Sequence, residues 1–431
     1  MEMSEAGRAR AGAGGGIDFT FADPMVLSNP HEFYRRLRQD DPVHFDPSIN
    51  SYIVSRYEDV TEVLRDAETF SQELGWKSQF GSGHFDELKQ ILERDGGGFF
   101  PEVLLLDPPG HTRIRKLLSE ALGTRRVEQL KPRVMKLIKD RVDAIADRGQ
   151  IDGVHDFAMP LTVDIMCEQL GFPQAEAASR IPLWARAYID QVSAPQTQEQ
   201  MRANAALICE LQHFIIDRVR EREETKQEDM ITDLIYAVIE DDESTKLAFA
   251  ETVALTRGLL LAGNDTTAMA ISSFLLLIAT QPDVASYVRG ILGDSRQLTR
   301  FVEELLRLKP PVRGLFRFTT REVELNGTVI PANAQVYVLF ASANDDESVF
   351  QCPRQFEADR SNVTRHLAFG AGIHFCAGVA LARMELKAVI VELMSRLTDF
   401  ELAVPMEELQ YAPSLTSMPL ESLPIRFRKI S

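Results

Sequence analysis

The chain has 431 residues, and its hydrophobic fraction of 45% is ordinary for a globular protein. Its 64 acidic residues outnumber its 47 basic ones, and the resulting net charge of −17 disfavours binding to nucleic acid or to an anionic membrane. The four cysteines show no paired spacing and no N-terminal apolar segment indicates a signal peptide, so we expect a cytoplasmic protein.

The N-terminus is rich in Arg, Ala and Gly, and we predict that residues 1–16 form a disordered tail. No Pro-, Ser- or Gly-rich linker interrupts the rest of the chain. We therefore expect a single domain over residues 17–431.

Apolar residues recur at helical spacing along most of the chain. The predicted helices are His31–Arg38, Val127–Ile145, Leu161–Leu170, Glu199–Glu223, Met230–Glu240, Leu247–Thr280 and Leu298–Leu308. Short strands are predicted at Ser51–Ser55, Val323–Leu325, Thr328–Ile330 and Gln335–Phe340, with a hairpin turn at Asn326-Gly327. The pattern predicts a mainly α protein, with a large helical body, a long central helix and small β-sheets at its edge.

The longest predicted helix, Leu247–Thr280, ends before Gln281-Pro282. The polar run Asn-Asp-Thr-Thr at residues 264–267 interrupts its apolar sequence, which favours a buried core helix over a membrane span. We expect this run to open the helix locally, with threonine hydroxyls bonded to backbone carbonyls. By itself, the run is compatible with a packing role or with proton transfer.

Cys376 lies in a glycine-punctuated loop that leads directly into a predicted helix. The loop reads Phe369-Gly370-Ala371-Gly372-Ile373-His374-Phe375-Cys376-Ala377-Gly378. Its glycines allow backbone conformations that a Cβ forbids, and the N–H groups of a helix start favour a thiolate. A lone cysteine is most often a small buried hydrophobic residue, but this loop suits an anionic sulfur that carries a metal.

The pattern Phe-Gly-x-Gly-x-His-x-Cys-x-Gly, followed by Leu-Ala-Arg, resembles the haem-binding loop of the cytochrome P450 family, the haem-thiolate monooxygenases. The resemblance extends over roughly residues 20–428. It implies haem b as the cofactor and Cys376 as the axial ligand of its iron. It also implies that Asp265 is the acid of a proton relay and that Thr266 is the hydroxyl near dioxygen.

Two further motifs support the resemblance. Glu304 and Arg307 lie three residues apart on one helix face, and in the family such a pair is buried together with a downstream arginine, here Arg360, as a structural network. The haem propionates require cations, and arginine suits their forked geometry. The residues that the resemblance assigns to binding the cofactor, besides Cys376, are His111, Arg115, Arg317 and His374.

The family places its substrate pocket between several segments of the chain. The possible pocket residues are Leu260, Leu261, Ala262, Val312, Arg313, Leu315 and Met418, with Trp76, Phe99 and Phe100 nearby. The mostly apolar lining suggests a terpenoid, steroid, fatty acyl or alkyl-aromatic substrate. Arg313 is the charged exception: it either meets a substrate carboxylate or points away, toward solvent or a propionate.

The resemblance implies a monooxygenase that transfers one oxygen atom of O2 to its substrate and reduces the other to water. No flavin or iron–sulfur motif is evident, so NAD(P)H would supply electrons indirectly, through a separate ferredoxin and its reductase. A peroxide-driven peroxygenase and a non-catalytic haem-binding or sensor protein are alternatives, and the intact pair of Asp265 and Thr266 argues against both.

Docking of an acidic ferredoxin to an acidic protein requires a local basic patch. The candidates for this patch are Arg113, Arg115, Lys116, Arg125, Arg126, Arg383 and Lys387.

Overall fold

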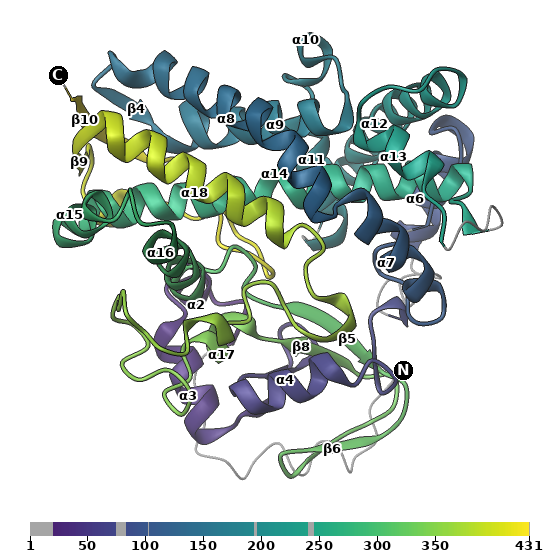
Figure 1. Cartoon of the computed structure of the whole chain (residues 1–431). Coiled ribbons are helices and arrows are strands. Elements are labelled where there is room, and N and C mark those ends of the chain that lie inside the picture. Colours follow the sequence, from purple (N-terminus) through teal and green to yellow (C-terminus); the bar gives the residue numbers. More distant parts are fainter. Residues whose placement is uncertain (1–19, 75–82, 102, 194–195, 240–244, 431) are drawn as a thin grey trace. The chain divides into compact units, whose positions relative to one another are not determined.

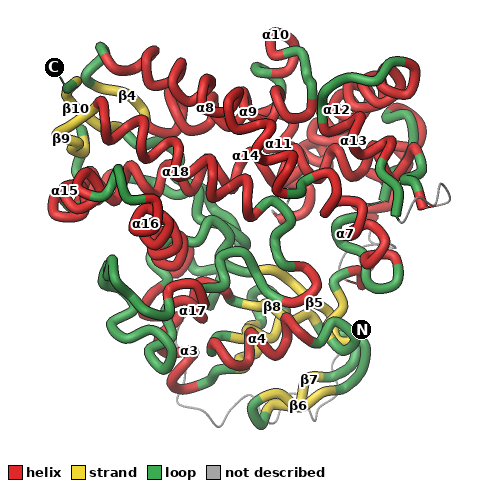
Figure 2. Tube along the Cα trace, in the orientation of Figure 1, coloured by secondary structure: helices red, strands yellow, loops and turns green. Residues whose placement is uncertain are grey.

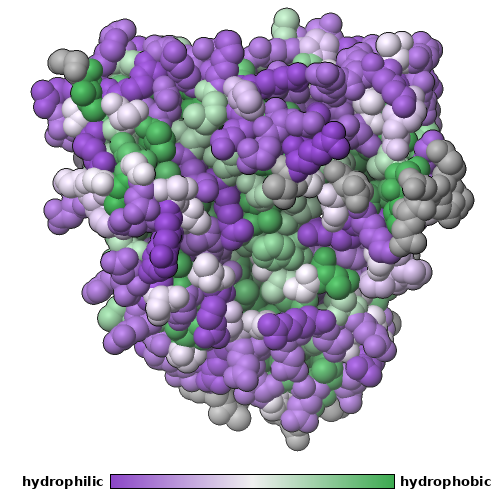
Figure 3. Space-filling model, in the orientation of Figure 1, coloured by the Kyte–Doolittle hydropathy of each residue, from purple (hydrophilic) through white to green (hydrophobic). Residues whose placement is uncertain are grey.

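The computed structural model describes residues 20–74, 83–101, 103–193, 196–239 and 245–430. The predicted tail and Trp76 lie outside these residues. Helices dominate and the strands are short (Figures 1 and 2), as the sequence predicted. The face seen in Figure 3 is mostly hydrophilic, in keeping with the large net charge.

The chain divides into two compact units, each assembled from segments that are distant in the sequence. Unit 1 comprises residues 1–75, 303–376 and 411–419, and unit 2 comprises residues 76–302, 377–410 and 420–431. The chain passes between the units several times, so no single linker separates them. This is why the sequence pattern suggested one domain over residues 17–431.

Unit 1 contains a five-stranded sheet in the order β1-β2-β8-β5-β3, in which only β2 and β8 are parallel. Its strands are Val43–Asp46 (β1), Ser51–Val54 (β2), Gln335–Val338 (β8), Leu315–Thr319 (β5) and Phe70–Ser71 (β3). The helices are Pro24–Ser28 (α2), His31–Asp40 (α3), Tyr57–Arg65 (α4), Phe340–Asn344 (α17) and the last residues of Ser295–Leu308 (α16), with the 3-10 turns Val363–Arg365 (η3) and Gly372–His374 (η4).

The predicted hairpin of unit 1 is confirmed. Strands β6 (Val323–Leu325) and β7 (Thr328–Ile330) pair antiparallel with the predicted bounds. Asn326 and Gly327 both have positive φ, 47° and 77°, which is the backbone that a two-residue hairpin turn requires.

Unit 2 is a helical body with a small antiparallel sheet in the order β4-β10-β9. The strands are Gln150–Asp152 (β4), Pro424–Lys429 (β10) and Leu397–Leu402 (β9). The helices are Gly83–Asp95 (α6), Gly110–Ala121 (α7), Thr124–Ala146 (α8), Gly153–Ala158 (η1), Met159–Leu170 (α9), Gln174–Ala177 (α10), Ile181–Ser193 (α11), Gln198–Glu224 (α12), Met230–Tyr236 (α13), Phe249–Thr280 (α14), Pro282–Gly290 (α15), Val379–Arg396 (α18), Met406–Glu408 (η5) and the start of α16.

Every predicted helix is present within a few residues of its expected bounds, except that α13 ends at Tyr236 instead of reaching Glu240. Several shorter helices were not predicted, among them α4, α6 and α11. Figure 1 shows α8, α9, α14 and α18 packed side by side in unit 2.

Helix α14 is the one described helix with the length and hydropathy of a membrane span. Its most apolar stretch is mostly buried within unit 2, which is the behaviour expected of a core helix. The predicted local opening at residues 262–267 is wrong, because α14 is regular α-helix throughout. The Thr266 hydroxyl donates to the Ala262 carbonyl at 2.6 Å, and this bond supplements the helical hydrogen bonds without breaking them.

Candidate functional site

The cysteine loop of unit 1 has the backbone that its glycines predicted. Gly370 and Gly372 both adopt φ of +69°, in the left-handed region. A Cβ on Gly372 would lie 2.1 Å from the Leu64 carbonyl oxygen, so the end of α4 leaves room only for glycine. The N–H of Cys376 donates to the Phe369 carbonyl at 2.9 Å, which closes the loop on itself.

Cys376 lies in a part of unit 1 that is only partly covered. The residue is half-buried, and the neighbouring Phe375 exposes 37% of its surface. Gly378, in unit 2, is the N-cap of α18 with an ordinary φ of −85°, and an added Cβ would have no atom within 4 Å. The position of Gly378 therefore leaves room for a group to approach without displacing side chains that the structure describes.

The expected network around α16 is present in unit 1. Glu304 and Arg307 are fully buried and share a two-pronged ion pair with N···O distances of 2.8 and 2.9 Å. Arg360 donates to the same carboxylate at 3.1 Å. Arg307 also donates to the Asn344 carbonyl at 2.9 Å. One carboxylate thus joins α16 to two segments that precede the cysteine loop.

The structure also describes the two other residues of unit 1 that were predicted to contact the cofactor, Arg317 and His374. Arg317 lies in β5, is buried, and donates to the Phe316 carbonyl at 2.8 Å. His374 is half-buried in η4, two residues before Cys376. Unit 1 thus contains Cys376, His374, Arg317 and the buried glutamate–arginine network.

The structure corrects the placement of Arg313. Its side chain is 2% exposed in the interior of unit 1 and donates to the carbonyls of Ser417, at 2.9 Å, and Leu27, at 3.2 Å. The guanidinium also stacks over the Phe21 ring, 5.6 Å from its centre. Backbone carbonyls thus accept from Nε and one terminal nitrogen of this guanidinium, and the side chain does not reach solvent.

The candidate pocket residues differ in burial. Leu260 is fully buried in the main core cluster of unit 2. Leu261 is half-buried and Ala262 is exposed, although α14 is otherwise a core helix. Val312, Leu315 and Met418 of unit 1 are half-buried, as is Phe99 of unit 2, whereas Phe100 is buried in the core of unit 2.

One face of α14 is open in the middle of the helix. Leu259, Ala262, Thr266 and Met269 follow one another at helical spacing, and none of them is fully buried. Leu260, Asn264 and Thr267, on other faces, are buried. An exposed apolar stripe on such a helix indicates a surface that binds a ligand or another part of a protein.

The opposite side of the same segment packs against α9. A Cβ on Gly263 would lie 2.6 Å from the Met166 sulfur, so this glycine allows the close approach of α9. Thr162 of α9 donates to the Asn264 side-chain oxygen at 3.0 Å. Asn264 in turn donates to the Asp265 carboxylate at 2.7 Å.

Asp265 is a carboxyl group held away from water. Burial raises its pKa above the ordinary value, and the Asn264 hydrogen bond and the charge of Arg186 on α11 oppose this shift. Arg186 itself pairs with Asp190. Asp265 and Thr266 therefore place a carboxyl of raised pKa next to a hydroxyl on α14, as the sequence predicted.

A second buried carboxyl, Glu385 of α18, was not predicted. It is 4% exposed, accepts from Gln169 of α9 at 3.1 Å and is hydrogen-bonded to the Thr267 hydroxyl of α14. Burial raises its pKa to about 8, so it is largely protonated at neutral pH. The sequence held a signal for the burial of Glu385, because this residue lies on the same helix face as Val389 and Leu393, at four-residue spacing.

The predicted propionate ligands of unit 2 lie at the start of α7. His111 is buried, and burial together with the charge of Arg115 lowers its pKa. Arg115 is half-buried, and its guanidinium has no hydrogen bond or ion pair with any residue that the structure describes. A half-buried cation of this kind suits an anionic group from a ligand.

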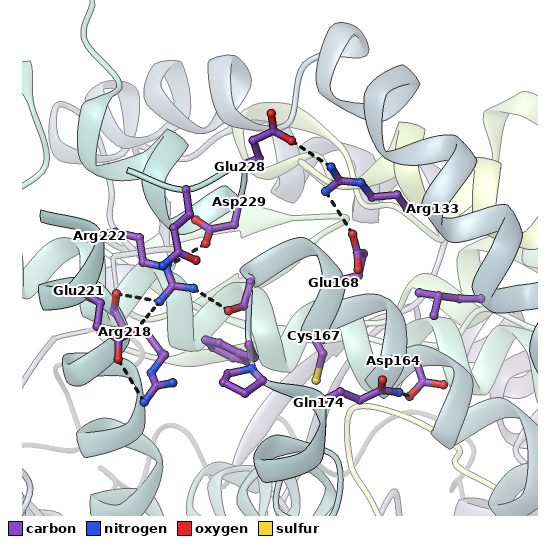
Figure 4. A pocket seen from close by; sticks show the side chains of 15 residues that line it. Arg133, Asp164, Cys167, Glu168, Gln174, Arg218, Glu221, Arg222, Glu228 and Asp229 are labelled. Carbon is purple, nitrogen blue, oxygen red and sulfur yellow. Dashed lines mark hydrogen bonds and ion pairs between the residues drawn. The ribbon is translucent and has the colours of Figure 1, made fainter. Parts of the chain in front are cut away.

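Figure 4 shows a different cavity of unit 2, of about 450 Å³, lined by residues of α8, α9, α10 and α12 and by the segment between α12 and α13. Arg222 donates to Asp229, at 2.8 Å, and to the Gly171 carbonyl, at 2.6 Å. Arg133 pairs with Glu168 at 3.2 Å. None of the predicted site residues lines this cavity. Its charges are paired with one another and join the end of α9 to the corner between α12 and α13.

Comparison with known proteins places the chain in a family. The family model described as cytochrome P450 matches residues 178–417. Cytochrome P450 107B1 of Saccharopolyspora erythraea is 31% identical over 423 residues, covering 95% of this chain and 98% of that protein. The cytochrome P450 monooxygenase PikC of Streptomyces venezuelae is 32% identical over 426 residues, covering 95% and 96%.

A further relative, the vitamin D(3) 25-hydroxylase of Pseudonocardia autotrophica, is 31% identical over 405 residues, covering 92% of this chain and 93% of that protein. The solved structure of cytochrome P450 CYP109Q5 from Chondromyces apiculatus matches with a TM-score of 0.81 at 29% identity, over 96% of this chain and 99% of that one. The match thus extends over nearly the whole chain in both sequence and fold, and the chain belongs to the cytochrome P450 family of monooxygenases.

Proposed function

We propose that this monooxygenase holds haem b through Cys376 and inserts one oxygen atom of O2 into a hydrophobic small molecule. The observation that carries the proposal is the cysteine loop, in which two left-handed glycines and a backbone hydrogen bond present a half-buried cysteine next to the partly exposed Phe375. The half-buried cysteine of this loop contributes little to a hydrophobic core. The loop is suited to a thiolate that binds a metal.

The residues present fit a haem. The sulfur of Cys376 would bind the haem iron. In unit 1, Arg317 and His374 would contact the propionates, and in unit 2 His111 and Arg115 would do so. The lack of a protein partner for Arg115 among the described residues supports this assignment. When bound, the haem supplies the activation of dioxygen.

The residues of α14 would deliver the two protons that are consumed when one oxygen atom of O2 is reduced to water with two electrons. The Thr266 hydroxyl hydrogen is directed to the Ala262 carbonyl, which leaves the lone pairs of Oγ1 as acceptors. Burial raises the pKa of Asp265, which favours its protonated form and makes this carboxyl group the candidate proton donor. Glu385, protonated beside Thr267, provides a second proton store on the other side of the same helix segment.

The substrate class follows from the apolar candidates for the pocket: Leu260, Leu261, Ala262, Val312, Leu315 and Met418. Arg313, the charged candidate, donates to backbone carbonyls. We therefore propose a neutral terpenoid, steroid, fatty acyl or alkyl-aromatic compound. The name of the vitamin D(3) 25-hydroxylase indicates that one relative acts on a substrate of this hydrophobic kind. A cytoplasmic ferredoxin, reduced through NAD(P)H and a reductase, would supply the electrons.

The decisive experiment replaces the sulfur. Cys376→Ser should abolish the absorption band of the carbon monoxide complex that is diagnostic of a haem-thiolate, whether or not haem is retained. Gly378→Ala should leave the unfolding of the haem-free chain nearly unchanged, because no atom lies within 4 Å of the added Cβ, but should weaken haem retention. A Cys376→Ser protein that keeps the thiolate band would contradict the proposal.

The relay is tested in a reconstituted system with ferredoxin, reductase and NADPH. Asp265→Asn should lower turnover roughly ten- to hundred-fold, and Thr266→Ala should divert electrons to hydrogen peroxide. Oxygen-dependent NADPH consumption coupled to product separates a monooxygenase from a peroxygenase and from a sensor. Wild-type coupling in both variants would remove the relay assignment.

A further inference from the structure

A second buried glutamate on α16 contacts the segment that leads into the cysteine loop. Glu303 precedes Glu304, and its side chain is 3% exposed. Its Oε2 lies 3.0 Å from Nε2 of His366, whose side chain is 2% exposed. Nothing in the proposed function so far uses this pair.

The hydrogen bonds of His366 determine where its proton lies. The backbone N–H of Ala368 donates to Nδ1 at 3.1 Å. Because a peptide N–H can only donate, Nδ1 must carry a lone pair, and the imidazole proton is on Nε2. The Nε2–H therefore donates to the Glu303 carboxylate. The His366 side chain thus connects Glu303 of α16 to the backbone N–H of Ala368, two residues further along the chain.

The segment held in this way is continuous with the loop around Cys376. The next residue, Leu367, donates its N–H to the Asn344 side chain at 2.7 Å. The His366 ring lies 5.9 Å from the ring of Phe369. The Phe369 carbonyl accepts the N–H of Cys376 at 2.9 Å. Residues 366–369 are therefore fixed at successive positions, and their last carbonyl holds the cysteine.

The two adjacent glutamates of α16 have separate targets. Glu304 binds Arg307 and Arg360, which lie before the loop. Glu303 binds His366, from which the chain runs directly into the loop. Successive residues of a helix point about 100° apart, so one helix can anchor two segments at once.

We propose that Glu303 and His366 are positioning residues for the cysteine ligand: they hold the Phe369 carbonyl in place and thereby fix the orientation of the Cys376 sulfur. This inference rests on the proposed role of Cys376. If the pair is broken, the Phe369 carbonyl is free to move, the hydrogen bond to Cys376 N–H weakens, and the sulfur is held less firmly. Replacing a residue that orients a metal ligand typically lowers metal affinity or activity by about 10- to 100-fold.

Two substitutions of His366 separate its two hydrogen bonds. The amide nitrogen of glutamine can replace Nε2 as the donor to Glu303, whereas the amide oxygen of asparagine can replace Nδ1 as the acceptor from Ala368. If the bond to α16 matters, His366→Gln should retain the thiolate form of the carbon monoxide complex. His366→Asn and Glu303→Leu should convert part of it to the shorter-wavelength form of a protonated or displaced thiol.

The second measurement is the rate at which haem is lost to an excess of apomyoglobin. We expect it to rise roughly ten-fold in His366→Asn and Glu303→Leu, at the lower end of the range for residues that orient a metal ligand, and to remain near wild type in His366→Gln. The control is His44→Gln, which alters another histidine–carboxylate contact of unit 1, to Asp41 at 2.8 Å, with no contact to the loop.

The outcomes are distinct. Variants of Glu303 and His366 that unfold at lower temperature but keep the thiolate band and the wild-type rate of haem loss would overturn the inference and leave the pair a packing contact. Equal effects of His366→Gln and His366→Asn would also overturn it. A thiolate band that persists in Cys376→Ser would instead overturn the proposed function, whatever the His366 variants do.

Discussion

The cysteine loop of unit 1 and the middle of α14 in unit 2 carry the two chemical motifs of the chain, and they are built differently. The loop owes its form to the backbone: left-handed φ at Gly370 and Gly372, and a carbonyl that holds the Cys376 N–H. The α14 segment is an ordinary helix whose chemistry comes from side chains and their burial.

This difference predicts two kinds of sensitivity. A loop defined by backbone geometry should fail when a Cβ or an unpaired charge is introduced, and the failure should appear as lost stability. A helix whose polar groups are defined by burial should keep its fold when an isosteric side chain is substituted, and the change should appear in protonation. The following predictions test that distinction, from the largest expected effect to the smallest.

Glu304→Leu should be the most destabilising substitution. It leaves the buried guanidiniums of Arg307 and Arg360 without the carboxylate they share, at a cost of about 3–5 kcal/mol in the free energy of unfolding. The matched control is Glu357→Leu, whose half-exposed carboxylate also pairs with Arg360. Denaturant titration should show a loss of less than about 1 kcal/mol there, and similar losses in both variants would be inconsistent with the network described.

Gly372→Ala should cost about 3 kcal/mol, because it combines a left-handed backbone with a Cβ that collides with the Leu64 carbonyl. Gly327→Ala is the control, since its φ of 77° is also left-handed but no atom lies within 4 Å of the new methyl group. That variant should lose only about 1–2 kcal/mol from backbone strain. Thermal unfolding of the two proteins tests whether the collision matters.

Glu385→Gln tests the buried carboxyl group of unit 2. The folded chain holds the Glu385 proton up to a pKa of about 8, whereas the ordinary value is 4.5. Between these values the folded state binds more protons than the unfolded state, so this group lowers stability as pH rises, by at most about 1.4 kcal/mol per pH unit.

The Glu385→Gln variant lacks this proton, and its free energy of unfolding should fall less than that of the wild type between about pH 4.5 and pH 8. The difference between the two proteins should level off above about pH 8. Denaturant titrations at a series of pH values measure both slopes, and parallel curves would show that Glu385 is ionised in the folded protein.

The smallest effect is expected in the predicted docking patch for ferredoxin, at its basic residues on α7 and at the start of α8. Arg113, one of its candidates, is half-buried and paired with Glu251, whereas Lys116 and Arg125 are exposed. Lys116→Glu should therefore lower ferredoxin-driven turnover roughly two- to ten-fold at low salt and less at high salt, with unchanged stability. Arg113→Glu should instead reduce stability. Turnover that is unaffected by Lys116→Glu would exclude this part of the patch from docking.

The features that the sequence determined by itself are those that depend on nearby residues. Helical periodicity identified α14 and the other long helices, and Asn326-Gly327 identified the hairpin, because both signals act over a few positions. The glycines of the cysteine loop likewise predicted the left-handed backbone that Gly370 and Gly372 adopt. The loop motif is local as well, and it sufficed to indicate the cytochrome P450 family.

Tertiary structure alone decided burial and the partners of charges. Gln169 and Glu385 are 216 residues apart in the chain, and only packing brings them together and raises the pKa of the glutamate. Leu260 and Arg313 lie in segments that the sequence assigned to a pocket, yet both face the interior of their units. His366 meets Glu303 from 63 residues away. Desolvation and Coulomb interactions depend on distances in space, and no local pattern in the sequence records them.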